Sequence, residues 1–394
     1  METIYFDHAA TTPTKPQVLD AMMPYFTQNF GNPSSVYQIA QINRKAVDDA
    51  RESIANAIGA KANEIFFTSG GTEADNWAIK GTAGRKNRKG NHIITTTIEH
   101  HAVLHTCEYL ERHGYEVTYL DVDEDGLVTP EQVEAAIKDT TILISVMYAN
   151  NEIGTIMPIK EIGAVAKAHG VTFHTDAVQA VGQEQIDVNE LGVDLLSLSG
   201  HKIYGPKGIG VLYIKRGVRL CPLIHGGAQE RGRRGGTENV PGIVGLAKAL
   251  ELSYADLDNK NNKIREIRDY IIEGIFKKIP YAKLNGHREK RLPNNVNISF
   301  EFVEGESILL LLDMNGIAAS SGSACTSGSL DPSHVMLGIG LPHEKAHGSI
   351  RITLGEMNTI EEADKLLETL PVIVQRMRDM SPLYEDFLNQ NKAK

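Results

Sequence analysis

The chain has 394 residues, 41% of them hydrophobic, which is enough apolar material for a folded body of two or three domains. Forty Lys and Arg residues against fifty Asp and Glu residues give a formal net charge of −10, which argues against a nucleic-acid-binding protein and against binding to anionic membranes. No apolar run is long enough to span a bilayer, and residues 1–16 lack the apolar core of a signal peptide, so we expect a cytoplasmic protein.

The first part of the chain alternates strand-like and helix-like stretches. Apolar residues at helical spacing between residues 35 and 58 predict an amphipathic helix that ends at Gly59. Beyond it, the runs IFFTS, HIITTT, EVTYL and TILISVMY are each followed by a helical pattern, and VTFHT leads to DLLSLS and GVLYI. This alternation is typical of βαβ units around a mostly parallel sheet with helices on both faces.

The pattern changes after these strands. A long charged helical stretch extends over about 241–278, with a predicted break near Asp258. The later runs NVNISF, IAAS and SIRITLG predict further strands, and ESILLLLDM predicts a helix between them. We therefore expect a large domain at 13–258 and a smaller domain formed by 1–12 and 259–394.

A glycine turn follows the first of the predicted strands. The stretch Ser-Gly-Gly-Thr at 69–72 lies between the strand IFFT and the next helix, where backbone N–H groups can converge on a phosphate. We take Gly71 and Thr72 as the candidate cradle, while an ordinary strand-to-helix turn would also use glycines there. No Gly-Lys-Ser/Thr follows, so the turn is not a nucleotide-binding P-loop.

An acid and an amine end two later strands. VTFHT leads to Asp176, with Gln179 three residues further on, and LLSLS leads to His201 and Lys202 in a Gly/Pro turn. A lysine can hold pyridoxal phosphate as a Schiff base, while a carboxylate keeps the pyridine nitrogen of that cofactor protonated. On this pattern alone, a solvated loop lysine and an ordinary turn aspartate are the alternative.

The three cysteines are widely spaced and lack a CxxC pair, so we expect reduced thiols and neither a disulfide framework nor a cysteine zinc site. Cys325 lies in SSGSACTSGS, among small polar residues and glycines, which favours an exposed and mobile thiol. Cys107 and Cys221 adjoin Leu, Tyr and Pro residues, and we interpret both as packed side chains.

Two further residues suit contacts with a substrate or a cofactor. Arg351 lies in the alternating run SIRITLG, from which a guanidinium can bind a carboxylate with two hydrogen bonds, and a structural salt bridge is the alternative. His100 follows HIITTTIE and can either stack on a cofactor ring or cap the next helix. The residues by themselves leave both choices open.

Two other motifs compete with this interpretation. His343, Glu344 and His347 match HExxH, the helical zinc-hydrolase motif, but a preceding proline and a following glycine leave about one helical turn. We therefore do not favour a metal site. The basic, glycine-rich stretch QERGRRGGT at 229–237 lacks the aromatic residues of an RNA-binding segment, and we interpret it as a loop near an anion.

Taken together, the order GGT, EHH, NNEIG, DAVQ, SGHK, GRRGGT, SSGSACTSGS and RITLG resembles the cysteine desulfurases of the NifS/IscS type, class V members of the fold-type I pyridoxal phosphate enzymes. The resemblance runs from DHAATT to the last helix. It implies an α/β fold of the pyridoxal phosphate-dependent transferase type, with a mostly parallel central sheet in a large domain plus a smaller α+β domain. It also implies a homodimer that converts L-cysteine to L-alanine and passes the sulfur to an acceptor protein such as an iron–sulfur scaffold.

The resemblance further implies roles for individual residues. Those implied to be catalytic are Lys202 as the Schiff-base lysine, Cys325 as the thiol that accepts sulfur as a persulfide, and His100 as a proton carrier stacked on the ring. Those implied to bind the ring or the phosphate are Asp176, Gln179, Thr72, Ser199 and His201, together with Thr237 at the phosphate in the partner subunit. Asn151 and Arg351 are implied to hold the substrate.

One departure and two alternatives accompany the resemblance. His8 stands where many members have asparagine. A selenocysteine lyase would share nearly all of these residues without needing Cys325. A non-enzymatic sulfur-assembly adaptor would keep the fold without holding the cofactor.

Overall fold

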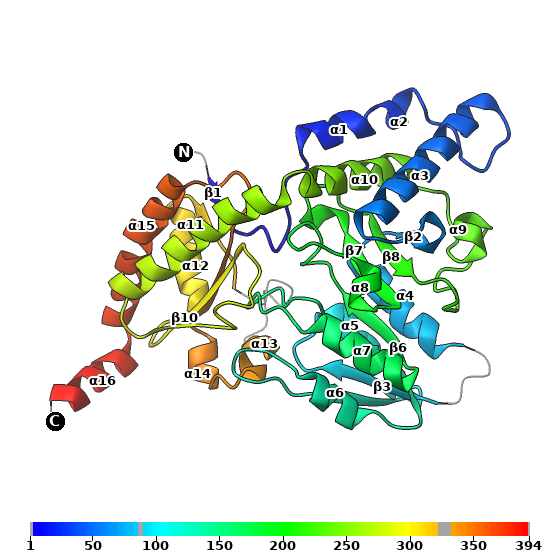
Figure 1. Ribbon diagram of the computed structural model, residues 1–394. Helices are drawn as coiled ribbons and strands as arrows, with labels where there is room; N and C mark the ends of the chain where they lie inside the picture. The colour runs from blue at the N-terminus through cyan, green and yellow to red at the C-terminus, as the bar shows by residue number, and fades with distance from the viewer. Residues whose placement is uncertain (1–2, 86–89, 322–331, 393–394) are drawn as a thin grey trace.

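The computed structural model describes residues 3–85, 90–321 and 332–392, which form two lobes joined by the helix α11 (Leu257–Lys278) (Figure 1). The prediction of an exposed, mobile Cys325 falls on residues 322–331 and lies outside the described residues. No helix within the described ranges is long and apolar enough to cross a membrane.

One lobe is built on a mostly parallel sheet, as the alternation of strand-like and helix-like runs predicts. Within the described chain this sheet has seven strands: β2 (Ile65–Thr68), β3 (His92–Thr96), β4 (Glu116–Leu120), β5 (Thr141–Ser145), β6 (Thr172–Asp176), β7 (Leu195–Ser199) and β8 (Gly210–Ile214). Their spatial order is β2-β8-β7-β6-β5-β3-β4, and among them β8 alone pairs antiparallel with both neighbours.

Helices cover both faces of this sheet, because successive residues of each strand point to opposite faces. Ile94 and Ile144 belong to the apolar cluster that also holds residues of α3 (Gln38–Ala57), α6 (Pro130–Ala136), α7 (Ile159–His169) and α10 (Val240–Tyr254). Their neighbours Ile93 and Leu143 pack on the other face against α4 (Gly71–Ala83) and α5 (His101–Glu111). The shorter helices of this lobe are α1 (Pro16–Met22), α2 (Pro24–Thr27), α8 (Val188–Leu191), α9 (Gln229–Gly232) and the 3-10 turns η1 (Ala62–Glu64) and η2 (Gly200–Lys202).

The predicted helix ends agree closely with the structure. The helix expected over residues 35–58 is α3, and Gly59 beyond it has φ of 70°, the left-handed conformation that favours glycine at a helix end. The long charged stretch is two helices, α10 and α11. The break between them comes just before the predicted Asp258, at Asp256, whose φ of −144° is not helical.

The second lobe combines a small antiparallel sheet with long helices. In the described chain its strands are β9 (Ala282–Leu284), β10 (Asn295–Phe300) and β12 (Ser349–Thr353), with β10 in the middle. The helices are α11, α12 (Gly305–Met314), α13 (His334–Gly338), α14 (His343–Ala346), α15 (Ile360–Asp379) and α16 (Pro382–Lys392). A separate parallel pair joins β1 (Ile4–Tyr5) to β11 (Ile317–Ala318), so the N-terminal segment belongs to this lobe.

Two large apolar clusters lie on either side of the join between the lobes. The second cluster contains Phe6 together with residues of α11, β10, β12 and α15. Val335 and Met336 of α13 pack instead on the cluster of the larger lobe. The division into domains at 13–258 and at 1–12 with 259–394 therefore stays a proposal, which the two clusters support and the position of α13 complicates.

Candidate active site

A cavity of about 370 Å³ lies at the carboxyl ends of the parallel strands, the place where open α/β sheets bind their ligands. It brings together most of the predicted site residues from both lobes: Gly71, Thr72, His100, Asn151, Asp176, Gln179, Ser199, His201, Lys202 and Arg351. Thr237 is not among its lining residues, and Cys325 lies outside the described residues. The structure thus locates these side chains, and their chemical roles stay proposals.

Lys202 reaches into this cavity from the turn that follows β7. Its Nζ donates hydrogen bonds to the carbonyl oxygens of Ala9 at 2.5 Å and Ala10 at 2.7 Å. Gln179 Nε2 donates to the same Ala9 oxygen at 3.0 Å. The N-terminal segment therefore supplies backbone acceptors that hold the lysine amine in the cavity.

Asp176 ends β6 and is 6% exposed. Burial raises the pKa of its carboxyl to about 6, although the N–H of Val178, at 2.9 Å from Oδ1, and the charge of Lys202 pull the pKa down. At neutral pH the side chain is still mostly ionised. Its negative charge is therefore available to a cationic group of a ligand in the cavity.

A cluster of buried polar groups adjoins Asp176, and sequence reasoning missed it, although its member Asp75 also lines the cavity. Burial raises the pKa of Asp75 and raises that of Glu99 to about 8, and Asp176 adds to both effects. His174 Nε2 lies 3.6 Å from Asp75 Oδ1, and its ring nitrogens contact Ser145 Oγ at 2.8 Å and Ser197 Oγ at 3.0 Å. Glu99 belongs to the EHH run, but no role was inferred for it, and Asp75 and His174 looked like ordinary helix and strand positions.

His100 has one of the two roles that its sequence position allows, the helix cap, and it also lies at the cavity. It is the N-cap of α5, where its Nδ1 accepts a hydrogen bond from the N–H of Ala102 at 3.1 Å, and it also lines the cavity. Burial, assisted by the nearby charge of Lys202, lowers the pKa of its imidazole to about 4. The ring is therefore neutral at pH 7, with its proton on Nε2 because Nδ1 is an acceptor.

The glycine turn lies between β2 and α4, as the sequence predicts, and its role as an anion cradle stays a prediction. The first N–H groups of a helix have no partner within the helix, so the N-terminus of α4 offers donors beside Ser199 and His201. A Cβ on Gly71 would lie 2.6 Å from Val178 Cγ2, so only glycine allows this close approach. Thr237 lines a separate cavity of about 60 Å³ that Ser69 also lines.

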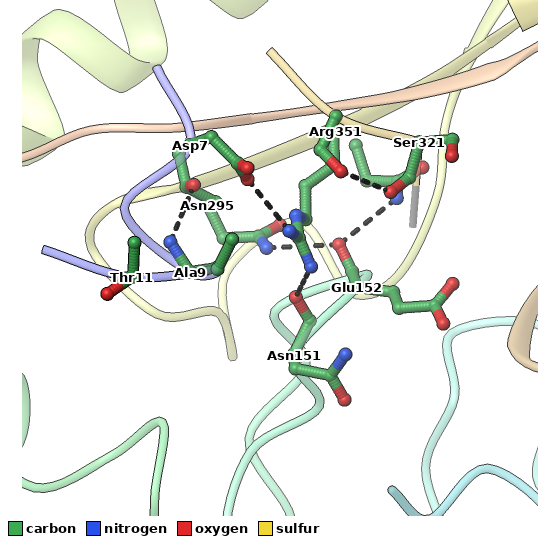
Figure 2. Close-up of polar contacts among 12 residues, drawn as sticks. Asp7, Ala9, Thr11, Asn151, Glu152, Asn295, Ser321 and Arg351 are labelled. Atoms are coloured by element: carbon green, nitrogen blue, oxygen red, sulfur yellow. Dashed lines mark hydrogen bonds and ion pairs between the residues drawn. The ribbon is translucent and has the colours of Figure 1, made fainter. Parts of the chain in front are cut away.

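Arg351 projects from β12 and is 2% exposed. Its Nη2 contacts Asp7 Oδ1 at 2.8 Å, and its Nη1 donates to the carbonyl oxygen of Asn151 at 3.0 Å (Figure 2). Its Nε has no hydrogen-bond partner within the described part of the chain. The guanidinium is thus both part of a salt bridge and still able to donate to a carboxylate in the cavity.

Three further residues at the site escaped sequence reasoning. Asp7 and the carbonyl of Ala9 come from the DHAATT stretch, whose small residues at the start of the chain were the available signal. Glu152 follows Asn151, and its buried Oε2 accepts a hydrogen bond from Ser333 Oγ at 2.5 Å. None of them belongs to a pattern that names its chemistry.

The remaining cysteines and the HExxH motif lie away from this cavity. Cys107 is fully buried and its pKa is raised to about 12 by burial, which confirms its interpretation as a packed side chain. Cys221 is half-buried, and its thiol donates to the carbonyl of Gly84 at 3.0 Å. His343 and His347 line a different groove, of about 830 Å³, and no side-chain group in the described ranges is arranged to hold a metal ion.

Comparison with known proteins agrees with this arrangement. The aminotransferase class-V family matches residues 4–366. The chain is 60% identical over 382 residues to the cysteine desulfurase IscS of Methanosarcina thermophila, a match that covers 97% of this chain and 94% of the relative. A solved structure titled NifS-like protein is 38% identical with a TM-score of 0.89, covering 95% of this chain and 99% of its own. Another, titled SspA in complex with cysteine, is 41% identical with a TM-score of 0.80, covering 91% and 100%.

The fold and the cavity define a class V aminotransferase, and the chain belongs to that family, whose enzymes depend on pyridoxal phosphate. Within the family it belongs to the cysteine desulfurases of the NifS/IscS type, as the resemblance of its motifs implies.

Proposed function

We propose that the protein converts L-cysteine to L-alanine with pyridoxal phosphate bound at Lys202, and transfers the sulfur to Cys325 as a persulfide. The observation that carries the proposal is the convergence of a lysine amine, a buried carboxylate and an arginine on one cavity: Lys202, Asp176 and Arg351. An acceptor protein such as an iron–sulfur scaffold would then take the sulfur from Cys325.

The residues of the cavity fit this cofactor. Asp176 is a buried carboxylate, and a protonated pyridine nitrogen would supply it with a positive partner. Gly71 lets Val178 pack close to the N-terminus of α4, whose free N–H groups suit a phosphate. Lys202, Gln179 and His100 would hold the aldehyde carbon, the ring oxygen and the ring face.

When bound, the cofactor withdraws electrons from the Cα of the amino acid that it carries. Asp176 keeps the ring nitrogen protonated, and Lys202 Nζ would remove the proton from Cα and return it. Arg351 would bind the substrate carboxylate through donors that its contacts with Asp7 and Asn151 leave in place.

The sulfur transfer needs a hydrogen-bond donor that orients the substrate sulfur and a thiolate that accepts this sulfur. His100 presents Nε2–H to the cavity, and we propose that it holds the substrate sulfur by a hydrogen bond. The thiolate of Cys325 would attack that sulfur, so that the carbon–sulfur bond breaks, a sulfur–sulfur bond forms and alanine leaves. Because Cys325 has to act as a free thiolate in each cycle, a cytoplasmic location, where thiols stay reduced, is part of the proposal.

An apolar surface on the larger lobe supports the proposed homodimer. Large apolar side chains of the segment from α1 to α3 are exposed: Leu19, Met23, Phe26, Phe30, Val36, Tyr37 and Ile42. Figure 1 shows this segment along the outer side of α10. Exposed apolar residues gathered in this way mark a protein interface, and a second copy of the chain is the occupant that we propose.

Visible spectra and product assays test the proposal. We expect the purified protein to be yellow with pyridoxal phosphate. L-cysteine should change its spectrum and yield alanine, and an added thiol reductant should release the persulfide sulfur as sulfide. Lys202→Ala should lose the absorbance of the covalently held cofactor, because it lacks the amine. Cys325→Ser should keep the colour and respond to L-cysteine but release less than about 1% of the wild-type sulfide, because the acceptor thiolate is missing.

Cys221→Ser is the matched control, since it removes a half-buried thiol away from the cavity and should keep wild-type turnover. Normal desulfuration by Cys325→Ser would contradict the role of Cys325. Turnover by that variant of selenocysteine but not of cysteine would favour a selenocysteine lyase. A wild-type protein that takes up no cofactor would favour the adaptor.

A further inference from the structure

The segment 226–238 contains the basic, glycine-rich stretch of the sequence and is anchored by an ion pair outside the cavity. Arg51 Nη2 contacts Glu230 Oε1 at 2.6 Å, and Arg51 Nη1 contacts Glu230 Oε2 at 2.9 Å. The two side chains are only 9% and 4% exposed. Loss of one partner from such a pair leaves an uncompensated buried charge. Breaking the pair therefore destabilises the folded protein strongly.

The same pair covers the open edge of the central sheet. β2 is an edge strand, and only β8 pairs with it among the described strands. The N–H of Phe67 donates to Glu230 Oε2 at 3.0 Å, and Arg51 Nη1 donates to the carbonyl of Ile65 at 2.5 Å. The two side chains therefore take the place of a neighbouring strand, just before β2 leads into the phosphate turn at 69–72.

The backbone at the anchor is strained. Glu230 has φ of 46° and Arg231 has φ of 59°, in the left-handed region that non-glycine residues rarely adopt. Such conformations persist where the surroundings over-determine them, often at ligand clamps. Here the surroundings are the pair with Arg51, a hydrogen bond from Arg231 to the carbonyl of Asn63 at 2.8 Å, and the Arg233 guanidinium over the ring of Phe66.

A second ion pair ties the segment to the far side of the phosphate turn. Arg234 donates to both carboxylate oxygens of Glu73, at 2.9 and 3.1 Å, and Glu73 also accepts the N–H of Ser69 at 2.8 Å. The segment is thus tied to the strand before the turn and to the helix after it. Its residue Thr237 lines the small cavity that Ser69 also lines.

We propose that Glu230 and Arg51 are positioning residues for the cofactor phosphate. Their pair fixes β2 and the segment 226–238 against each other, and so fixes the shape of the turn at 69–72. The inference rests on the proposed function, because it assumes that the phosphate binds at this turn. Neither residue lines the cavity, so binding of the cofactor ring depends on the pair only through the phosphate.

The test compares pyridoxal phosphate with pyridoxal, which lacks the phosphate. Each compound is titrated into the apo forms of the wild-type protein and of Glu230→Gln, with visible absorbance as the readout. We expect the Kd for pyridoxal phosphate to rise at least about tenfold in Glu230→Gln, since an uncompensated Arg51 displaces the turn. The Kd for pyridoxal should change less than about twofold, because the ring contacts do not involve the pair.

Glu116→Gln is the matched control. Glu116 lies on β4, the strand at the opposite edge of the sheet, and its exposed ion pair is with Lys138, so the substitution should change neither Kd. Arg51→Lys keeps the positive charge but loses the bidentate contact with Glu230. It replaces Glu230→Gln in the comparison if that variant does not fold. Equal losses for both compounds, or no loss for either, would overturn the inference. A wild-type protein that binds neither compound would overturn the proposed function and this inference with it.

Discussion

At the scale of single residues, burial sets the charges around the active site. The imidazoles of His8 and His100 both have a pKa lowered to about 4 by burial, whereas burial raises the pKa of Asp176 to about 6 and that of Glu99 to about 8. At neutral pH the neutral imidazole of His100 and the largely ionised Asp176 therefore line the cavity, while the raised pKa of Glu99 favours its protonated form away from the lining. These states follow from depth in the fold and not from residue type.

The effect of burial on pKa can be measured at His8. It is 3% exposed, and neither ring nitrogen makes a hydrogen bond of good geometry within the described ranges, although the nearby backbone of Tyr5 acts to raise the pKa. Its folded-state pKa of about 4 lies below the usual 6.5, so the unfolded chain binds a proton more readily between these values. Its contribution to stability is complete above about pH 6.5 and is lost as the pH falls towards 4.

We expect His8→Asn to remove about 2 kcal/mol of the pH dependence of unfolding between about pH 7 and pH 5. Denaturant unfolding at several pH values measures it, and comparison with the wild type cancels the opposite contributions of the buried acids. His113→Asn, at an exposed position, serves as the control and should keep the wild-type dependence on pH. An unchanged dependence in His8→Asn would mean that a water or another group satisfies the buried ring.

At the scale of elements, the N-terminal segment links the two lobes at the active site. β1 pairs with β11 in the smaller lobe, and Thr12 then accepts the N–H of Tyr204 at 2.7 Å in the larger lobe. Between these anchors, Asp7 contacts Arg351, and the carbonyl of Ala9 accepts Lys202 Nζ. One short segment thus positions the proposed substrate group and the proposed cofactor group relative to each other.

Asp7→Asn tests this linkage. Loss of the charge should let the Arg351 guanidinium turn away from its position, and we expect the KM for L-cysteine to rise roughly tenfold, the effect of about 1.4 kcal/mol, with kcat within about threefold. Steady-state kinetics measure both. Asp49→Asn, which removes an exposed pair with Lys45 on α3, is the control and should leave KM unchanged. A lowered KM would show that Asp7 competes with the substrate carboxylate.

At the scale of the whole molecule, the proposed dimer surface is formed by exposed apolar side chains of the segment from α1 to α3. Phe26 and Phe30 are 54% and 70% exposed within it. Such side chains are stable in contact with a second chain, and their exposure in a monomer would be unfavourable by about 1.5–3 kcal/mol each.

The double variant Phe26→Asp with Phe30→Asp should therefore raise the dimer dissociation constant at least about 100-fold, because it replaces buried apolar area with charges. Sedimentation equilibrium over a range of concentrations measures the constant. Met314→Asp changes a side chain of α12 that is 80% exposed outside this surface, and its dissociation constant should match that of the wild type. A double variant that still dimerises like the wild type would place the interface elsewhere.

The sequence by itself determined the order of elements and the type of chemistry. Alternating runs such as HIITTT and its following helix predicted the parallel sheet, since the periods of strand and helix depend only on backbone geometry. The turn at 69–72, Asp176 and Lys202 could be found because strand ends at one edge of a sheet lie close together in space. The order of the motifs along the chain then identified the family.

Only the tertiary structure decided which groups support that site. The contact of Asp7 with Arg351 joins residues 344 positions apart, and that of Arg51 with Glu230 joins residues 179 apart. Local patterns carry no trace of such pairs, because the pairing depends on how lobes and segments pack and not on spacing along the chain. The same holds for the raised pKa of Asp176, since the desolvation that causes it exists only once the sheet and its helices have closed around the carboxyl group.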